Sequence, residues 1–337
     1  MHKFAKDFNT LHYIIKHATK ILLFAHNSPD SDTAGSNLAM REYLIEKGKL
    51  VDIACFDPYP AYLEAISPSR FEYPDHLDLV SYDAIIACDS VERGFQKIYP
   101  VKSPLSGDGE AVFNRVHNID KEKQIVVLID HHPDITIKGD VTIIDPSYSS
   151  VSEIVYDFLE STGEKITKNI ATYLLLGILG DTGSFQHSNT TARVMEIASD
   201  LMSRGANISK IIEVVFSNKK ISTLRLWGRA FEKARIDSKS GAIVTVLTQK
   251  DLDELGSSTD DIAQVASILN TVPGTKFSLI LSEREDGVIK GSLRSEEYKG
   301  VDVSKIAQRF GGGGHKLASG FEIKGKIIET ENGWEIA

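Results

Sequence analysis

The stretch Ile125-Val126-Val127-Leu128-Ile129, followed directly by Asp130-His131-His132, decides the fold of this 337-residue chain. Five consecutive apolar residues, most of them β-branched, indicate a strand that is buried on both faces, as in a parallel sheet. Similar short runs occupy residues 21–25, 51–56, 84–88 and 141–144, and stretches with helical spacing, such as 34–47, lie between them. This alternation predicts an α/β domain with a doubly wound, mostly parallel sheet.

Ionisable side chains follow these runs where each predicted strand ends. His26, Asp30 and Asp32 follow the first run, Asp89 follows the run 84–88, and a helix that begins near residue 170 ends at Asp181. Because ligands of open α/β sheets bind beyond the carboxyl ends of the strands, we expect these side chains to meet there.

Carboxylates and imidazoles together form a mixed oxygen and nitrogen ligand set, which suits Mn²⁺ better than Mg²⁺ or structural Zn²⁺. Two such ions ~3.5–4 Å apart could hold a hydroxide between them and neutralise a phosphoryl transition state. Asp89 stands alone at its strand end and is the natural candidate for a carboxylate that bridges both ions.

Each of these residues also has a structural interpretation. Asp30 and Asp32 could cap the helix that follows them. Asp181 lies in a glycine-rich turn, and His131 and His132 could be ordinary, partly buried histidines. Their joint occurrence at strand and helix ends favours a metal site.

The pattern changes after about residue 236. Strand-like segments at 242–247, 276–282, 288–294 and 321–324, with helical stretches at 258–270 and 302–310, predict a smaller α+β domain with a partly antiparallel sheet. We therefore expect a catalytic domain at 1–205, a helical linker at 206–235 and a second domain at 236–337. Within the first domain, Ser150-Val151-Ser152-Glu153 reads as a capping box that opens a helix reaching about residue 161.

The bulk properties limit the choice of partner. A formal net charge of −9 and a pI near 5.6 argue against a broad basic surface for long nucleic acids, whereas bound cations would still allow a small anionic substrate. Cys55 and Cys88 lie in or beside apolar runs and read as buried residues in a reducing compartment. No segment approaches the ~18 apolar residues of a membrane span, so we expect a cytoplasmic protein.

Taken in order, these motifs resemble those of the DHH phosphoesterase superfamily, in the subfamily with a C-terminal DHHA1 domain. The matching segments are His26-Asn27-Ser28-Pro29-Asp30-Ser31-Asp32, Asp89-Ser90, Asp130-His131-His132, Gly180-Asp181-Thr182-Gly183-Ser184-Phe185, and Gly311-Gly312-Gly313-Gly314-His315 with Ala318-Ser319-Gly320-Phe321. The resemblance extends over nearly the whole chain.

The resemblance implies a role for each matching residue. One Mn²⁺ would be held by His26, Asp30 and Asp89, and a second by Asp32, Asp89, His131 and Asp181, with Mg²⁺ or Co²⁺ as substitutes. Asp130 would orient an imidazole and His132 would face the substrate phosphate. From the second domain, Arg294 and His315 would contact a phosphate, helped by backbone N–H groups of Gly312, Gly313 and Gly314.

The glycine run has other interpretations. It is not a P-loop, because Leu317 follows Lys316 where a P-loop has Ser or Thr, and a predicted helix precedes the run. A flexible linker would not require His315 at the return to apolar sequence. We therefore favour a phosphate-binding loop.

Length and domain content resemble the group of bifunctional oligoribonucleases and pAp phosphatases, where pAp is 3′-phosphoadenosine 5′-phosphate. The expected reaction is attack of a metal-activated hydroxide on phosphorus, which releases 5′-mononucleotides from short RNA oligonucleotides or AMP from pAp. A phosphodiesterase for cyclic di-AMP or its linear product pApA is the alternative within the family. A nucleotide-binding regulator without activity is another class, but it would lack a metal ligand, and every expected ligand is present. The resemblance to this group also implies a homodimer. The chain departs from the pattern of the group by an inserted loop at residues 100–123.

Overall fold

A computed structural model gives the structure of the chain and describes residues 3–91, 93–99, 124–133, 135–217, 220–257, 262, 264–284, 287–330 and 333–337. The chain divides into two compact units, Met1–Ser217 and Asn218–Ala337, and each is described by itself. The predicted insertion at 100–123 lies outside the described residues.

The first unit is built on a five-stranded parallel sheet of order β2-β1-β3-β4-β5. Its strands are β1 (Lys20–Phe24), β2 (Leu50–Ala54), β3 (Ala84–Cys88), β4 (Ile125–Asp130) and β5 (Val141–Ile144). Each predicted apolar run forms one strand, so the prediction of a mostly parallel α/β sheet is confirmed. The chain places β2 on one side of β1 and then β3 on the other. In open α/β sheets, ligands bind at such a reversal, beyond the carboxyl ends of the two strands.

Both faces of this sheet are covered, which explains why the central strands β1, β3 and β4 consist almost entirely of apolar residues. Ile21 and Leu23 pack into the core under the α-helices, whereas Leu22 and Phe24 pack on the opposite face. The helices of the first face are α1 (Ala5–His17), α2 (Ser31–Glu46), α3 (Val151–Ser161), α4 (Lys168–Asp181), α5 (Ala192–Ser203) and α6 (Ile208–Ile212). The other face is covered by short 3-10 helices, among them Leu79–Ser81 and Phe95–Lys97.

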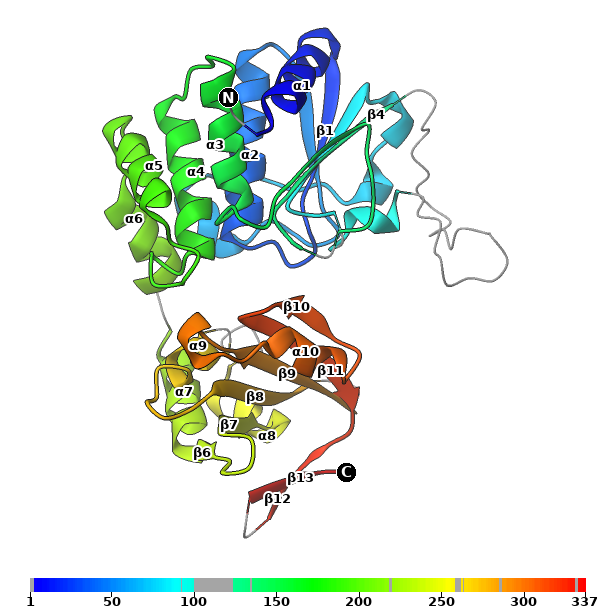
Figure 1. Cartoon of the computed structure of the whole chain (residues 1–337). Helices are drawn as coiled ribbons and strands as arrows, with labels where there is room; N and C mark the ends of the chain where they lie inside the picture. Colours follow the sequence, from blue (N-terminus) through cyan, green and yellow to red (C-terminus); the bar gives the residue numbers. More distant parts are fainter. Residues whose placement is uncertain are drawn as a thin grey trace. The chain divides into compact units, whose positions relative to one another are not determined.

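Helices α2, α3 and α4 lie side by side (Figure 1), and glycines allow α2 and α4 to approach very closely. A Cβ atom added to Gly35 of α2 would lie 2.9 Å from the backbone N of Gly177 in α4. A Cβ atom on Gly180 would lie 2.6 Å from Cβ of Ser31. The carboxyl end of α4, which bears Asp181, is therefore held against the first turn of α2, which bears Asp32.

The second unit contains a six-stranded mixed sheet of order β10-β11-β9-β8-β7-β6, in which only the β7–β8 pair is parallel. The strands are β6 (Arg235–Ile236), β7 (Ala242–Leu247), β8 (Phe277–Arg284), β9 (Val288–Arg294), β10 (Gly313–His315) and β11 (Ala318–Lys324). The helices are α7 (Ile221–Lys233), α8 (Gln249–Leu255), α9 (Val265–Leu269) and α10 (Val303–Gln308), and a hairpin of β12 (Ile327–Thr330) and β13 (Gly333–Ile336) ends the chain. The predicted α+β class of this part is confirmed.

One element differs from the predictions, and one prediction stays open. The helix expected at 258–270 is described only as the short α9, because residues 258–261 and 263 lie outside the described part. Residues 206–235 contain α6, a π-helical turn at Glu213–Ser217 and α7, and their function as a linker stays a prediction.

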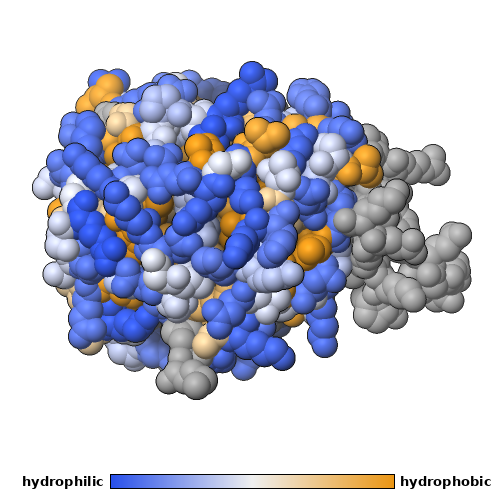
Figure 2. All heavy atoms as spheres, turned by 90° about the horizontal axis from the view of Figure 1, so that it is seen from above, coloured by the Kyte–Doolittle hydropathy of each residue, from blue (hydrophilic) through white to orange (hydrophobic). Residues whose placement is uncertain are grey.

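The face of the molecule in Figure 2 is mostly hydrophilic, with hydrophobic residues in small separate groups. Within the described residues, the helices are too short or too polar to cross a membrane.

Candidate active site

The carboxyl end of β1 presents His26 to the carboxylates of Asp30 and Asp89. The Nδ1 of His26 lies 2.6 Å from the carbonyl oxygen of Asn27, which can only accept a hydrogen bond, so Nδ1 carries the proton. The Nε2 of His26 lies 3.2 Å from Oδ2 of Asp30 and 3.6 Å from Oδ2 of Asp89. Nε2 of His26 therefore points toward two carboxylates while Nδ1 is held by a backbone carbonyl, which is the usual arrangement of a metal-binding imidazole.

Asp30 performs the capping role considered from the sequence and still has an oxygen for the site. Its Oδ1 accepts hydrogen bonds from the backbone N–H groups of Asp32 at 3.1 Å and Thr33 at 3.0 Å, which caps α2. Its Oδ2 faces His26. Burial opposes the charge on Asp30, but the attraction of His26 and Arg93 holds the pKa of this carboxyl well below its ordinary value.

Asp32 caps a different helix from the one expected. Its Oδ2 accepts a hydrogen bond from the backbone N–H of Val151 at 2.7 Å, and its Oδ1 from that of Ser152 at 2.9 Å, so it holds the start of α3 rather than α2. Asp32 is fully buried. Burial and the nearby charge of Asp181 raise the pKa of Asp32 to about 7.

Asp89 lies between these groups in a strained backbone conformation. Its φ of 55° is in the left-handed region, which residues other than glycine adopt at a cost that often marks functional sites. The hydroxyl of Thr33 donates to Oδ2 of Asp89 at 2.5 Å, whereas its buried Oδ1 accepts no hydrogen bond from the described residues. Burial and the carboxylates of Asp32 and Asp30 raise the pKa of Asp89. Sequence reasoning missed Thr33, because its role depends on a contact between α2 and β3.

His131 follows β4 and faces Asp181. Its Nε2 lies 3.1 Å from Oδ2 of Asp181, and its Nδ1 donates to the carbonyl oxygen of Tyr148 at 3.2 Å. Burial disfavours the charged imidazole, but the carboxylate of Asp181, with those of Asp89 and Asp32, raises the pKa of His131 well above its ordinary value.

The hydrogen bonds at the start of α3, residues 149–153, differ in part from the predicted capping box. Ser150 Oγ accepts a hydrogen bond from the backbone N–H of Glu153 at 3.2 Å, as expected. The Glu153 carboxylate, however, accepts from the backbone N–H and the hydroxyl of Ser149, both at 2.8 Å, rather than from the N–H of Ser150. The N–H groups at the start of α3 are already used by Asp32.

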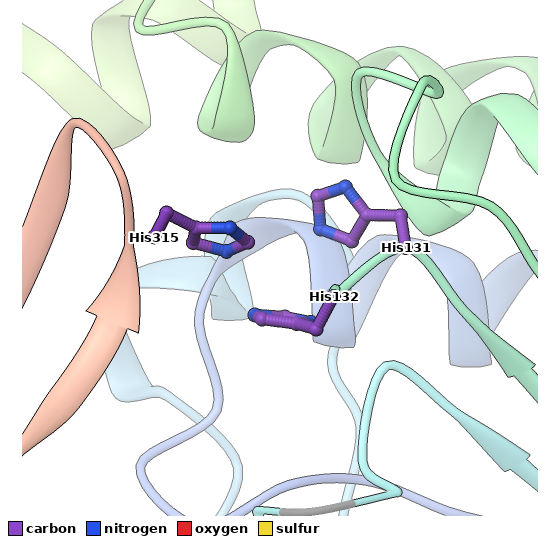
Figure 3. Close-up of side chains that lie close together, drawn as sticks. All are labelled: His131, His132 and His315. Atoms are coloured by element: carbon purple, nitrogen blue, oxygen red, sulfur yellow. The ribbon is translucent and has the colours of Figure 1, made fainter. Parts of the chain in front are cut away.

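Asp130 holds the two histidines that follow it. Its Oδ1 accepts hydrogen bonds from the backbone N–H groups of His131 at 2.8 Å and His132 at 3.0 Å, and from Nδ1 of His132 at 2.7 Å. Burial opposes the charge of Asp130, but the hydrogen bonds and the charge of His132 lower its pKa. The two imidazole rings, which Figure 3 shows after β4, meet edge to face with their centroids 4.8 Å apart. Asp130 therefore fixes the orientation of the His132 ring through Nδ1.

These side chains form groups in which one ligand atom from each residue lies within 4.8 Å of the others. Three such groups consist of residues of the first unit alone: His26 with Asp30 and Asp89, Asp32 with Asp89 and His131, and Asp89 with Asp130 and His132. Asp89 belongs to each of these groups, as a bridging carboxylate would. The raised pKa values of Asp32 and Asp89, and an Oδ1 of Asp89 that accepts no hydrogen bond from the described residues and lies 3.5 Å from Nδ1 of His132, fit a site that divalent cations complete, because cations would neutralise the crowded negative charge.

In the second unit, Arg294 and His315 lie in one row across the sheet. Ala318 of β11 is paired with Arg294 of β9 on one side and with His315 of β10 on the other. Residues directly opposite in antiparallel strands point to the same face, so the small side chain of Ala318 lies between a guanidinium and an imidazole. The pKa of Arg294 is lowered by burial, and within the described residues no carboxylate forms an ion pair with it. This row could bind an anion.

The second half of the glycine run, Gly313 and Gly314, forms strand β10 with His315 at the edge of the sheet, where the sequence predicted a loop. Gly313 and Gly314 pair with Gly320 and Ser319, and His315 ends the strand (Figure 3). A Cβ atom on Gly314 would lie 2.7 Å from the carbonyl oxygen of Ala318 and would also require a side chain at φ 130°. The glycines therefore allow close pairing with β11 at a position where larger residues would clash.

Comparisons with known proteins identify the family of the chain. Residues 20–178 match the family model described as the DHH family, N-terminal domain, and residues 239–332 match that of the DHHA1 domain. The bifunctional oligoribonuclease and PAP phosphatase NrnA of Thermus thermophilus is 30% identical over 92% of this chain and 86% of its own length. The protein of the same description from Bacillus subtilis is 28% identical over 90% of this chain and 89% of its own length.

Two further similarities are less direct. The cyclic-di-AMP phosphodiesterase GdpP of Geobacillus thermodenitrificans is 27% identical over 91% of this chain, but this match covers only 45% of that protein. The crystal structure of an exopolyphosphatase-related protein from Bacteroides fragilis matches with a TM-score of 0.83 and 24% identity, over 97% of this chain and 94% of that chain. This structural similarity shows the fold alone. The motifs, the two family models and the relatives together establish that the chain belongs to the DHH family, among the members that also carry a DHHA1 domain.

Proposed function

We propose that this phosphoesterase hydrolyses short oligoribonucleotides to 5′-mononucleotides, and pAp to AMP, with two Mn²⁺ ions per chain. The observation that carries the proposal is the pair of neighbouring ligand groups that share Asp89. The two NrnA relatives, whose similarity extends over nearly their whole length, support the choice of substrates.

The proposed ligands of the first ion are His26, Asp30 and Asp89, and those of the second are Asp32, Asp89, His131 and Asp181. Their mixture of carboxylates and imidazoles favours Mn²⁺, with Mg²⁺ or Co²⁺ as substitutes. Bound ions would activate the attacking water and neutralise charge on the phosphoryl group. Asp130 holds the His132 ring through Nδ1, and we propose that Nε2 of His132 meets a phosphate oxygen or the leaving oxygen of the substrate.

In the second unit we propose that Arg294 and His315 bind a substrate phosphate beside the one that is cleaved. The planar guanidinium of Arg294 can donate two parallel hydrogen bonds to phosphate oxygens. Gly312, Gly313 and Gly314 would contribute by keeping bulky side chains away. Gly313 and Gly314 would also offer backbone N–H groups, whereas the N–H of Gly312 already donates to the carbonyl oxygen of Ala307 at 3.0 Å. The expected homodimer stays a prediction, which light scattering in solution would test.

A phosphodiesterase for cyclic di-AMP or pApA is the second candidate. The observation that favours it is the similarity to GdpP, which is weaker because the match covers less than half of that protein. The metal ligands do not separate the two candidates, because both reactions break a phosphorus–oxygen bond with the same groups.

One panel of substrates tests the proposal. Product release is measured with Mn²⁺ on pAp, pApA, cyclic di-AMP and 5′-labelled RNAs from two to about twenty-four nucleotides. Fast cleavage of pAp and the shortest RNAs, with cyclic di-AMP unchanged, is the expected result. Preference for cyclic di-AMP or pApA alone would support the second candidate, and no cleavage of any substrate would favour a nucleotide-binding regulator.

A further inference from the structure

The turn that follows Asp89 fixes the backbone of Arg93 against the end of β1. The backbone N–H groups of Arg93 and Phe95 both donate to the carbonyl oxygen of Ser90, at 3.2 and 3.0 Å. The carbonyl oxygen of Arg93 accepts from the backbone N–H of Asn27 at 2.8 Å, next to His26. The main chain of Arg93 is thus tied to both strand ends that bear proposed metal ligands.

The side chain of Arg93 is held far less firmly than its backbone. Its guanidinium Nη1 lies 4.0 Å from Oδ2 of Asp30, and the side chain is 46% exposed. Among the described residues, Asp30 is the one carboxylate within ion-pair distance of Arg93. Such a long and exposed ion pair contributes little to stability, so it is a poor explanation for an arginine on a fixed turn.

The partner of Arg93 is also the oxygen that the proposed function requires for a metal ion. Oδ1 of Asp30 caps α2, so Oδ2, which faces His26, is the atom left for a cation. Once a divalent cation takes this oxygen, Arg93 stands beside a second positive charge, and an anion that contacts both would relieve their repulsion.

We propose that Arg93 binds a phosphate oxygen of the substrate from the metal-bearing unit. This inference rests on the proposed phosphoesterase function and adds a substrate-binding residue outside the family motifs. The guanidinium suits the task because its charge is permanent and its donors match phosphate oxygens in pairs. Arg93 acts on the reacting phosphate or its neighbour, whereas Asp30 and His26 hold the ion.

The test compares Arg93→Ala and Arg93→Lys with wild type in three measurements. These are KM and kcat for pAp, the inhibition constant of inorganic phosphate, and Mn²⁺ affinity without substrate, followed by electron paramagnetic resonance. For Arg93→Ala we expect KM and the phosphate inhibition constant to rise by about tenfold or more, as for loss of a charged hydrogen bond. The values for Arg93→Lys should lie between those of wild type and Arg93→Ala, because lysine keeps the charge but lacks the planar pair of donors. Mn²⁺ should bind no more weakly in either variant.

Arg70→Ala is the matched control, because Arg70 is another exposed arginine of this unit and pairs with Glu72 at 3.1 Å, outside the ligand groups. It should leave all three measurements unchanged. If Arg93→Ala weakens Mn²⁺ binding and leaves KM and phosphate inhibition as in wild type, Arg93 only positions Asp30 and the inference is wrong. Wild-type protein that hydrolyses nothing would instead overturn the proposed function itself. Circular dichroism of all three variants excludes misfolding as the cause.

Discussion

The carboxylate of Asp32 accepts a hydrogen bond from the backbone N–H of Val151 at 2.7 Å, between residues 119 positions apart in the sequence. This bond joins the first turn of α2 to the first turn of α3 at the candidate metal site. A helix N-terminus favours a negative charge. Burial and the charge of Asp181 nevertheless raise the pKa of Asp32 to about 7, so without a cation they outweigh the helix N-terminus.

The metal-free protein should therefore lose stability as pH rises. The pKa of Asp32 is about 7 in the fold and 3.8 ordinarily, so the folded state holds a proton that the unfolded chain has already released. The stability contributed by this proton is full below pH of about 4 and is lost as pH rises through about 7, by a few kcal/mol at most. Thermal unfolding with a chelator between pH 5 and 8 measures the slope.

Asp32→Asn is the comparison for this slope, because asparagine keeps the shape but does not ionise. Its unfolding temperature should depend less on pH than that of wild type over the same range. Added Mn²⁺ should stabilise wild type more at pH 8 than at pH 6, since the ion then meets ionised carboxylates. Equal slopes in the two proteins would show that Asp32 does not carry the effect.

Substitutions at Asp89 and His26 should differ in the number of ions lost. Asp89→Asn removes a carboxylate that belongs to both proposed ion sites, and should abolish turnover and reduce bound Mn²⁺ at both. His26→Ala removes a ligand of one group only, so about one ion per chain should remain. Elemental analysis after dialysis against Mn²⁺ counts the ions. Wild-type turnover by Asp89→Asn at saturating Mn²⁺ would contradict the bridging role.

Asp130→Asn should weaken the site without removing a metal ligand. Oδ1 of Asp130 accepts hydrogen bonds from Nδ1 of His132 and from two backbone N–H groups. Asparagine has no negative charge, so its oxygen would accept these bonds more weakly. Loss of such a supporting group typically costs about 10–100-fold in metal affinity or activity. Steady-state kinetics and Mn²⁺ titration together measure the cost. An effect as complete as that of Asp89→Asn would indicate that Asp130 binds the ion directly.

The sequence predicted the strands of the first unit well, because a strand buried on both faces leaves a continuous apolar run. It also predicted which side chains meet, since the carboxyl ends of parallel strands share one edge of the sheet. The helix that Asp32 caps could not be predicted. That contact requires α3 and α2 to be adjacent, and it depends on glycines in α4 that lie far away in the sequence.

The second unit shows why glycine-rich segments are hard to assign. Glycine is depleted in strands, so residues 313–315 read as a loop, yet they pair with β11. The pairing requires glycine at position 314, because a Cβ atom there would clash with the carbonyl oxygen of Ala318. This clash depends on the folded position of β11, which the sequence does not show. The hairpin of β12 and β13 was also missed, since its short strands show weak alternation.

Arg294→Ala should mainly raise the KM for pAp or short RNA, by about tenfold, with a smaller effect on kcat, because it removes binding remote from the attacked phosphorus. Ala318→Leu tests the row itself. Its side chain would enter the space between Arg294 and His315, and it should raise KM with both charged groups still present. Lys324→Ala, at the far end of β11, is the control for both. Unchanged KM in Ala318→Leu would argue against a phosphate in this row.

Two helical glycines provide the last prediction, because they should respond to alanine in opposite ways. A Cβ atom on Gly177 would lie 2.5 Å from Oδ1 of Asp32, whereas one on Gly228, in α7, would meet no atom within 4 Å. Gly228→Ala should raise the free energy of unfolding by roughly 0.5–1 kcal/mol through helix propensity. Gly177→Ala should lower it by about 1–3 kcal/mol through overpacking.

Gly177→Ala should also weaken Mn²⁺ binding, since α4 and Asp32 cannot both keep their places. Urea unfolding with a chelator and Mn²⁺ titration separate the two effects, because the first measures the packing of α4 and the second the position of the Asp32 carboxylate. Gly228→Ala should bind Mn²⁺ as wild type does. If Gly177→Ala is destabilised but keeps wild-type Mn²⁺ affinity, then the close approach of α2 and α4 serves packing alone and Asp32 finds its position by other contacts.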